Sequence, residues 1–417
     1  MTPEAQLVLQ LRQQVSKSSV KKLQALRDRV SPDGVLRRNY KFYGAHTGRW
    51  SGEGVQLQNL PRPIKSLEDE DAYSRAVSAV RAGGDLAVFG FPLDVVASCI
   101  RGAFRAPEGK TFVVADLSAI ENRVLAWLAD CRQMTQVYVN KLDPYKAFAA
   151  DYLYRVLYDE VTKLQRQMSK PAVLGCGYQL SGGFECWYCP RCGEARSPEE
   201  QLCAHCEYLG TEVEQTDVIK TGLWGYAEAM GVTMTKEEAH AAVKAFREAY
   251  PEVVQLWRNL QNAAIKATLD RTRVEVGPIA FVGFKGLLCC LLPSGRRLHW
   301  IKPEVVEGEY GNVLTYWGVD STTKQWRALQ TYGGKLTENL VQAISRDVLA
   351  EGMLRADDAG FDIVGHTHDE IITLCPDKET KKATYLDELI LRMTDPMPWA
   401  PDLVLGADGY TSQIYRK

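Results

Sequence analysis

The chain has 417 residues, of which 46% are apolar and 24% charged; this is ordinary for a globular protein and allows one large core or two to three domains. The net charge of -2 excludes no class of partner, but residues 1–65 carry twelve Lys or Arg against four Asp or Glu, a local charge of +8 that suits a polyanion or a solvated helix face. No targeting segment opens the chain, and its longest apolar stretch, residues 279–292, is interrupted by Lys285 and is too short to cross a bilayer, so we expect no membrane contact.

The amino-terminal part reads as one helix followed by loops. Apolar residues at helical spacing predict a helix over residues 4–30, and Ser-Pro-Asp-Gly at 31–34 ends it in a turn. Residues 40–63 are rich in Gly, Gln, Asn and Pro, which predicts a loop. The acidic run at 68–71 predicts a second loop that is exposed to solvent.

Next comes a short apolar strand, residues 112–115, which leads into Asp116. A helix is predicted over residues 119–130, and Ser118 with Glu121 fits a capping box at its start. Asp116 is therefore expected at the edge of an element, where a side chain can face a site.

The remaining elements alternate between helices and strands. We predict two helices within 143–180, one or two within 235–270 with a break at Pro251, strands over 273–320, a helix over 336–358, and a β-hairpin over 361–374 with its turn near 367–370.

Asp369 lies at that hairpin turn, so the chain offers two carboxylates at element edges, Asp116 and Asp369. Mg²⁺ prefers hard oxygen ligands and retains several waters, so two carboxylates together with substrate phosphates suffice to bind it, and two such ions are the equipment of phosphoryl transfer. Each Asp also has an ordinary explanation as a cap of its own element. His366 and His368 alternate along one strand and are weaker candidates for metal ligands.

A cationic stripe follows from a four-residue spacing. Arg166, Lys170, Leu174 and Tyr178 would share one helix face, with cations for a triphosphate at its start and an apolar end for a base or sugar. Pro171 complicates this reading, because proline removes a backbone donor and disfavours helix at the preceding residue. A solvated basic edge remains the alternative.

Three segments in this order resemble the motifs of family A DNA polymerases, the group of bacterial polymerase I and many phage replicases, from about residue 40 onward. Asp116-Leu-Ser-Ala-Ile-Glu121-Asn-Arg is similar to motif A, Arg166 to Tyr178 to motif B, and His368-Asp-Glu to motif C. Thr47-Gly-Arg with Leu57-Gln-Asn-Leu-Pro is similar to the segment of the family that contacts primer and template.

The resemblance implies a role for each matched residue. Two Mg²⁺ ions would be held by Asp116 and Asp369, with the backbone carbonyl of Leu117, and Glu121 would exclude a 2′-hydroxyl. The implied nucleotide contacts include Lys170, which would also act in catalysis: Leu117, Glu121, Tyr145, Arg166, Lys170, Leu174 and Tyr178. The implied contacts to DNA are Arg49, Gln58, Asn59, Gln342 and His368.

Two positions depart from the pattern of the family. Leu174 stands where the family usually has Phe or Tyr, so we expect slower incorporation and strong discrimination against dideoxynucleotides. Tyr145 stands at a place that is often His. In addition, Asn339 precedes Gln342 by three residues where the family usually has four, which leaves the role of Asn339 open.

The implied fold is an α+β right-hand polymerase with an antiparallel-sheet palm, helical fingers, a reduced thumb and a zinc-ribbon insertion. Residues 1–45 would form the thumb, 46–130 and 273–417 the palm, and 131–272 the fingers with the insertion at 184–210. Only about forty residues precede the match, so we expect no 3′–5′ exonuclease in this chain, and a separate exonuclease, thumb or processivity subunit is a possible partner.

The insertion is recognised by its cysteines. Cys189, Cys192, Cys203 and Cys206 form C-x2-C-x10-C-x2-C, which predicts one tetrahedral structural Zn²⁺ in a reducing compartment. Cys186 precedes Cys189 by three residues, so the register stays open.

The sequence thus predicts a DNA polymerase that binds primer–template DNA and deoxynucleoside triphosphates, in the cytoplasm of a bacterial host if it is phage-encoded. Two alternatives remain. One is a catalytically inactive zinc-ribbon subunit that binds DNA. The other is a relative of the single-subunit RNA polymerases, against which Glu121 argues.

Overall fold

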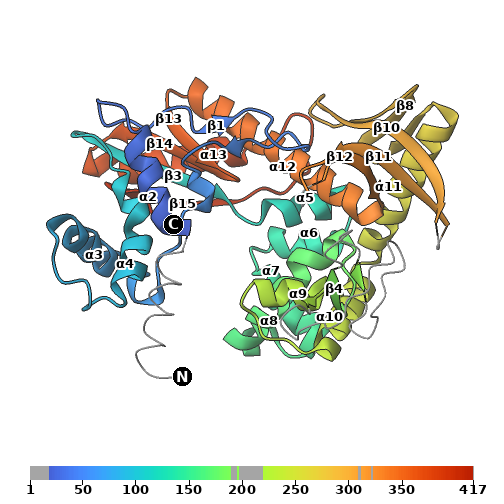
Figure 1. The fold of residues 1–417 in the computed structure, drawn as a ribbon, viewed down its shortest axis with the longest axis horizontal. Helices are drawn as coiled ribbons and strands as arrows, with labels where there is room; N and C mark the ends of the chain where they lie inside the picture. The colour runs from blue at the N-terminus through green and yellow to red at the C-terminus, as the bar shows by residue number, and fades with distance from the viewer. Residues whose placement is uncertain (1–17, 189–194, 197–218, 309–310, 321–322, 417) are drawn as a thin grey trace. The chain divides into compact units, whose positions relative to one another are not determined.

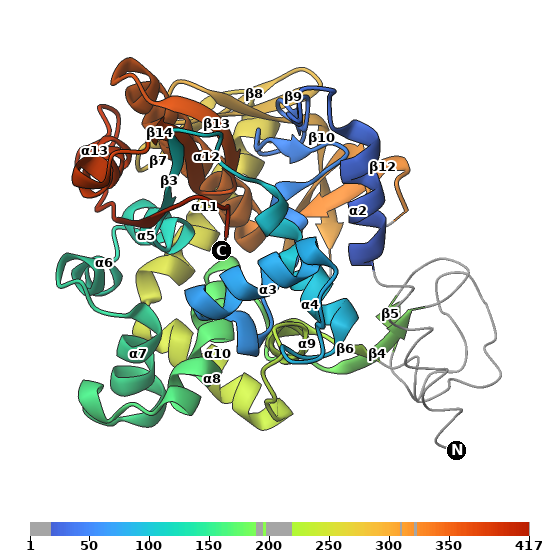
Figure 2. The same cartoon turned by 90° about the vertical axis from the view of Figure 1, so that its left-hand side faces the viewer.

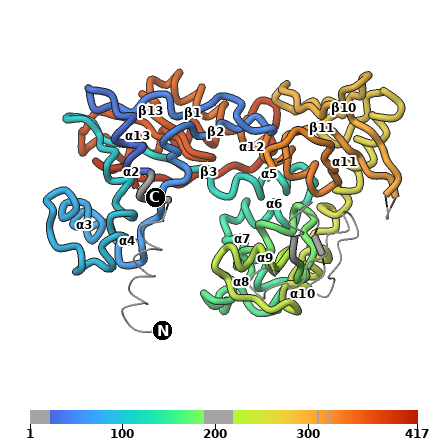
Figure 3. The backbone as a smooth tube through the Cα atoms, viewed as in Figure 1, coloured from blue at the N-terminus to red at the C-terminus, as the bar shows by residue number. Residues whose placement is uncertain are grey.

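The structure is a computed structural model that describes residues 18–188, 195–196, 219–308, 311–320 and 323–416. The chain divides into two compact units (Figures 1 and 3). The first comprises Met1–Ser118, Arg346–Asp395 and Leu405–Lys417, and the second comprises Ala119–Ser345 and Pro396–Val404.

The first unit is built on a four-stranded antiparallel sheet of order β13-β14-β3-β15. Its strands are β3 (Lys110–Leu117), β13 (Asp362–Thr367), β14 (Glu370–Pro376) and β15 (Ala407–Ser412). β3 lies in the interior of the sheet, which explains its run of apolar residues, with Val113, Val114 and Ala115 at most 1% exposed. The predicted strand before Asp116 and the predicted carboxyl-terminal hairpin are both confirmed.

Helices and short strands complete the first unit. They are α2 (Ser18–Arg29), α3 (Glu70–Ala82), α4 (Pro92–Ser98), α13 (Lys382–Thr394), β1 (Tyr40–Lys41) and β2 (Ser51–Gly52). α13 packs against β3 and β15, and α3 and α4 are seen side by side in Figure 2. The acidic run at 68–71 is exposed as predicted, but only its first half is loop. Asp69 caps α3 by accepting from Ala72 N, and Glu70 and Asp71 form the first turn, where the helix dipole favours acids.

The second unit begins with helices: α5 (Ile120–Leu128), α6 (Arg132–Val139), α7 (Pro144–Phe148), α8 (Lys163–Gly175), α9 (Gly222–Ala229), α10 (Lys236–Ala249) and α11 (Pro251–Asp270). The break at Pro251 is confirmed. The region predicted as two helices is more divided: α7 continues as a π-helix, Ala149–Tyr154, which ends at Arg155 in the left-handed conformation (φ 56°).

A six-stranded antiparallel meander follows, of order β12-β11-β10-β9-β8-β7. Its strands are β7 (Arg273–Val276), β8 (Ile279–Phe284), β9 (Leu287–Leu291), β10 (Arg297–Gly308), β11 (Gly311–Val319) and β12 (Trp326–Thr331). α11 packs against one face of this sheet. A small sheet joins β4 (Glu185–Tyr188), β5 (Ala195–Arg196) and β6 (Ile219–Lys220), and α12 (Gly333–Asp358) confirms the predicted late helix.

Among the helices of the described residues, none combines the length and the apolar character that a bilayer crossing requires.

Candidate active site

The two predicted metal-binding aspartates lie at the ends of neighbouring strands in the first unit. The register of β14 against β3 places Glu370 opposite Asp116, and the Leu117 N–H donates to the Asp369 carbonyl at 2.9 Å. Both aspartates are partly exposed. Their carboxylates are hard oxygen donors, as Mg²⁺ requires, so the pair fits that ion. No group of three or more His, Cys, Asp or Glu side chains suited to a metal is found among the described residues.

The turn that carries Asp369 has an unusual backbone. Thr367 pairs with Glu370, so His368 and Asp369 form a two-residue loop, and His368 adopts φ 47°. Left-handed backbone is uncommon outside glycine but is more frequent for Asn, Asp and His. Such a conformation persists only where the surroundings hold it, and it is frequent at functional sites.

A buried carboxylate, Glu370, holds the base of this turn. Glu370 is 1% exposed and accepts from the Thr367 hydroxyl at 3.1 Å and from the Tyr415 hydroxyl at 2.6 Å. Burial, followed by the nearby charge of Glu370, raises the pKa of Tyr415, so the phenol keeps its proton and stays a donor. Tyr415 therefore holds in place the carboxylate of Glu370, the residue that follows Asp369.

Arg101 extends this network to the segment predicted to contact primer and template. Arg101 is 3% exposed and donates to the Tyr415 hydroxyl at 3.1 Å, to the Leu60 carbonyl at 3.0 Å and to the Pro61 carbonyl at 3.2 Å. A buried guanidinium with three acceptors joins residues 57–61 to the hairpin of Asp369.

Three of the predicted DNA contacts, Arg49, Gln58 and His368, line one small pocket. The same pocket is lined by the rings of Tyr40, Trp50 and His366 and by the side chain of Arg346, which together are called the aromatic cluster.

In this aromatic cluster the His366 ring stacks on Tyr40 (centroids 4.3 Å apart, 19° between planes) and meets Trp50 edge-on at 4.7 Å. Arg346 lies 4.2 Å from the Trp50 ring centre and donates to the Gly48 carbonyl at 3.1 Å. Burial and the charge of Arg346 lower the pKa of His366 to about 4, so its ring is neutral at pH 7.

The other two predicted DNA contacts, Asn59 and Gln342, are not among the residues that line this pocket. Asn59 is exposed, and its backbone carbonyl accepts from Lys22 Nζ. Gln342 belongs to the second unit, where its amide donates to Glu338 Oε1 at 3.1 Å.

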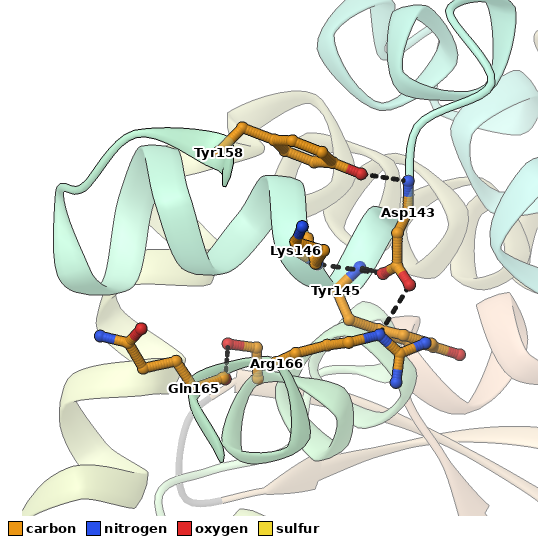
Figure 4. A network of polar contacts seen from close by, with 7 residues as sticks. Asp143, Tyr145, Lys146, Tyr158, Gln165 and Arg166 are labelled. Carbon is orange, nitrogen blue, oxygen red and sulfur yellow. Dashed lines mark hydrogen bonds and ion pairs between the residues drawn. The ribbon is translucent and has the colours of Figure 1, made fainter. Parts of the chain in front are cut away.

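In the second unit, the predicted phosphate-binding cations Arg166 and Lys170 both lie near the Tyr145 ring. Figure 4 shows Arg166 beside Tyr145 and Asp143. Arg166 Nε donates to Asp143 Oδ2 at 2.7 Å, and its guanidinium lies 5.1 Å from the Tyr145 ring centre. Lys170 Nζ lies 5.9 Å from the same ring. Asp143 also caps α7 by accepting from the N–H groups of Tyr145 and Lys146. One carboxylate thus orients both the helix start and the Arg166 side chain.

The four residues predicted to share one face of α8 do not all lie on the α-helix, because a 3₁₀ turn follows it. α8 contains Pro171 and stops at Gly175, so Leu174 lies on the α-helix and Tyr178 on the 3₁₀ turn after it. The Tyr178 hydroxyl nevertheless donates to Glu121 Oε2 at 3.2 Å. The structure therefore brings together Glu121 and Tyr178, two of the residues predicted to contact the nucleotide.

The predicted capping box at α5 is wrong. The cap of α5 is Ala119 at φ 52°, which makes no side-chain cap bond, and the Ser118 hydroxyl donates instead to Asp408 Oδ2 at 2.7 Å on β15. Glu121 is therefore not needed to cap α5, and its carboxylate reaches Tyr178.

Sequence reasoning named no role for four residues of these networks: Arg101, Asp143, Arg346 and Tyr415. Asp143 carried a local signal, because Asp followed by Pro is a frequent helix start. The other three residues, Arg101, Arg346 and Tyr415, each bond to a residue more than 290 positions away in the sequence. The bonds are those from Arg101 to Tyr415 and from Arg346 to Gly48, and no local sequence pattern predicts them.

The zinc-ligand prediction lies outside the described residues, since Cys189, Cys192, Cys203 and Cys206 all fall in 189–194 or 197–218. Cys186 is described: it is fully buried in β4, opposite Ile219.

Comparison with known proteins agrees with the predicted resemblance. A family model described as DNA polymerase family A matches residues 1–183. The DNA polymerase of Bacillus phage SP02 is 35% identical over 416 residues, covering 98% of this chain and 57% of that protein. DNA polymerase I of Chloroflexus aurantiacus is 31% identical over 169 residues, covering 40% of this chain and 15% of that protein. The chain thus spans little more than half the length of the phage relative.

A solved structure shares the fold. The POL domain of Pol1 from M. smegmatis, in complex with DNA primer-template and dNTP, aligns with a TM-score of 0.54 at 17% identity, covering 95% of this chain and 51% of that one. The predicted α+β polymerase fold with antiparallel sheets is confirmed at this level, and the relationship to family A DNA polymerases is confirmed by the sequence matches.

Proposed function

Because the chain is related to the family A DNA polymerases, we propose that it is a template-directed DNA polymerase that extends a primer 3′-hydroxyl with deoxynucleoside triphosphates. The observation that carries the proposal is the pairing of β3 with β14, which sets Asp116 and Asp369 at adjacent strand ends. Without that pairing, the two carboxylates could not act together.

The primer–template and the triphosphate are the proposed partners. The primer 3′-hydroxyl gives its proton to solvent, and its oxygen forms a bond to the α-phosphorus. The bond from the α-phosphorus to the bridging oxygen of the β-phosphate breaks, and pyrophosphate leaves with that electron pair. Asp116, Asp369 and the Leu117 carbonyl would hold two Mg²⁺ ions, which when bound lower the pKa of the 3′-hydroxyl and neutralise the leaving group.

The chain's own cations and rings would bind the nucleotide. Arg166 and Lys170 neutralise the triphosphate, and Lys170 assists departure of pyrophosphate. Arg166 is already oriented by Asp143, so little side-chain entropy is lost on binding. Tyr145 contacts phosphate, and Leu174 faces the sugar without a stacking ring.

Glu121 and Tyr178 would select the sugar and the base pair. Their 3.2 Å hydrogen bond supports a gate in which Glu121 lies under the sugar and excludes a 2′-hydroxyl. This favours DNA synthesis over the alternative of an RNA polymerase. Arg49, Gln58, Asn59, Gln342 and His368 would contact primer or template.

We further propose the subdomains expected from the resemblance: a thumb in residues 1–45, a palm in 46–130 and 273–417, and fingers in 131–272. A structural Zn²⁺ held by Cys189, Cys192, Cys203 and Cys206 belongs to the fingers insertion.

A separate chain with exonuclease or processivity function remains a proposed partner. Because a relative is encoded by a Bacillus phage, we place the activity in the cytoplasm of a bacterial host.

Primer extension with Mg²⁺ tests the proposal. Asp116→Asn and Asp369→Asn should each reduce the extension rate by on the order of 10²–10³-fold or more, because a charge aimed at the reacting phosphate is lost. The matched control is Asp362→Asn on the same hairpin, whose 2.8 Å pair with Lys110 is about half exposed and contributes little.

The same assay separates the alternatives. A wild-type chain that binds primer–template but extends no primer would favour the inactive DNA-binding subunit. Equal use of ribonucleotides and deoxynucleotides would favour the RNA polymerase relative.

A further inference from the structure

The six-stranded sheet of the second unit has one covered face and one open face. Phe281, Leu288, Trp300 and Leu314 point toward α11 and are at most 1% exposed. The opposite face carries large apolar side chains in solvent: Phe284 is 55% exposed, Ile301 43%, Val319 58% and Trp326 53%. Exposed apolar side chains gathered on one face usually mark a binding surface.

Strand register arranges these side chains in a row. Phe284 pairs with Leu287, Leu287 with Ile301, Ile301 with Trp317, and Val319 with Trp326. Paired residues lie on the same face, so Phe284, Leu287, Ile301 and Trp317 cross β8 to β11 at one level, and the pair of Val319 with Trp326 lies two residues further along β11 and β12 on that face. These six residues are called the platform.

The platform is bordered by cations. Three exposed cations lie on or beside it: Lys285, Arg297 and Lys302. Two carboxylates lie there as well: Glu304 on β10, and Asp320 after β11, which is paired with Arg327 at 4.0 Å. A shift of register after Ile301, together with φ 48° at Lys302, marks a bulge in β10. A bulge changes the direction in which a side chain points. At this bulge the Lys302 side chain lies over a ring of the platform, with its Nζ 5.4 Å from the Trp317 ring centre.

We propose that this platform binds single-stranded DNA, and we identify it with the unpaired template, so the inference rests on the proposed function. Aromatic rings on a sheet stack on unpaired bases whatever their sequence, and nearby cations take the phosphates. Duplex DNA hides its base faces and would leave the rings in water. An acidic protein would use the cations but not the flat rings.

The test compares two primer–templates of the same duplex, one with a template overhang of a single nucleotide and one with a long oligo-dT overhang. Phe284→Ala/Trp326→Ala removes two side chains that are more than half exposed, so it leaves no cavity in the core. Affinity for the long overhang should fall at least about tenfold, since each stacked base contributes on the order of tenfold or more. Affinity for the short overhang should not change.

Two controls sharpen the result. Leu157→Ala truncates another side chain of the same unit, 70% exposed, and should change neither affinity. Lys302→Gln should lower the slope of log affinity against log salt for the long overhang by about 0.7, the loss of one phosphate contact.

Equal affinities of wild type and Phe284→Ala/Trp326→Ala for the long overhang would overturn the proposal and point to a protein partner. A loss of equal size on both substrates would also overturn it, because the rings would then act on folding or on the duplex. Wild-type extension of the short-overhang substrate tests polymerase activity separately, so a failure of the proposed function is distinguished from a failure of the platform.

Discussion

Removing one hydroxyl should loosen the hairpin that carries Asp369. Tyr415→Phe deletes the donor to Glu370 at 2.6 Å and the acceptor of Arg101 at 3.1 Å while keeping the ring. Hydrogen bonds to charged groups contribute about 1.5–3 kcal/mol each, and both charges here are nearly fully buried.

The expected loss is smaller than the sum of two such bonds. Glu370 keeps the Thr367 hydroxyl, and Arg101 keeps the carbonyls of Leu60 and Pro61. We therefore expect the free energy of unfolding to fall by about 3 kcal/mol.

Urea unfolding measures this change, and primer extension reports its effect on the site. Because the weakened bond lies beside Asp369, extension should slow at least several-fold. Tyr385→Phe on α13 makes the same chemical change where no hydroxyl contact is found in the described structure, and should stay within about 0.5 kcal/mol of wild type. A Tyr415→Phe protein as stable as the Tyr385→Phe protein would refute the reasoning.

Four further outcomes are expected. His366 has a pKa lowered from 6.5 to about 4 by burial and by Arg346, so the unfolded chain takes up a proton that the folded chain does not. The stability tied to this shift is complete above pH 6.5 and is lost as pH falls toward 4, by up to about 3 kcal/mol; His366→Phe should flatten this part of the stability–pH curve, and an unchanged curve would contradict the assignment. Asp143→Asn keeps the cap of α7 but removes the charge that orients Arg166, so the KM for deoxynucleotides should rise roughly threefold to tenfold with little change in the melting temperature. Leu174→Tyr should make the enzyme more tolerant of dideoxynucleotides, measured as chain termination beside Leu174→Met, and equal termination by both variants would count against the implied sugar contact. Zinc chelation should lower stability or DNA binding yet leave nucleotidyl transfer in the folded protein, with metal analysis before and after as the control.

The local sequence determined the elements that rest on local physics. The apolar run before Asp116, the hairpin around Asp369 and the break at Pro251 follow from side-chain periodicity and from proline geometry, which neighbouring residues fix. The ordered motifs also pointed to the family, because nucleotidyl transfer requires carboxylates for metal ions and cations for phosphates, and the motifs contain both residue types.

Tertiary structure decided what holds those residues in place. The cap of α5 could not be predicted, because Ser118 bonds to Asp408 on a strand 290 positions away rather than to its own helix. The same holds for Arg101 with Tyr415, for Arg346 over Trp50, and for the open face of the meander. Each depends on which groups from distant parts of the chain come together, or on which face of a sheet is left uncovered, and local sequence pattern carries no record of that proximity. For Arg101 and Tyr415 the cause is desolvation, because an unpaired buried charge is costly.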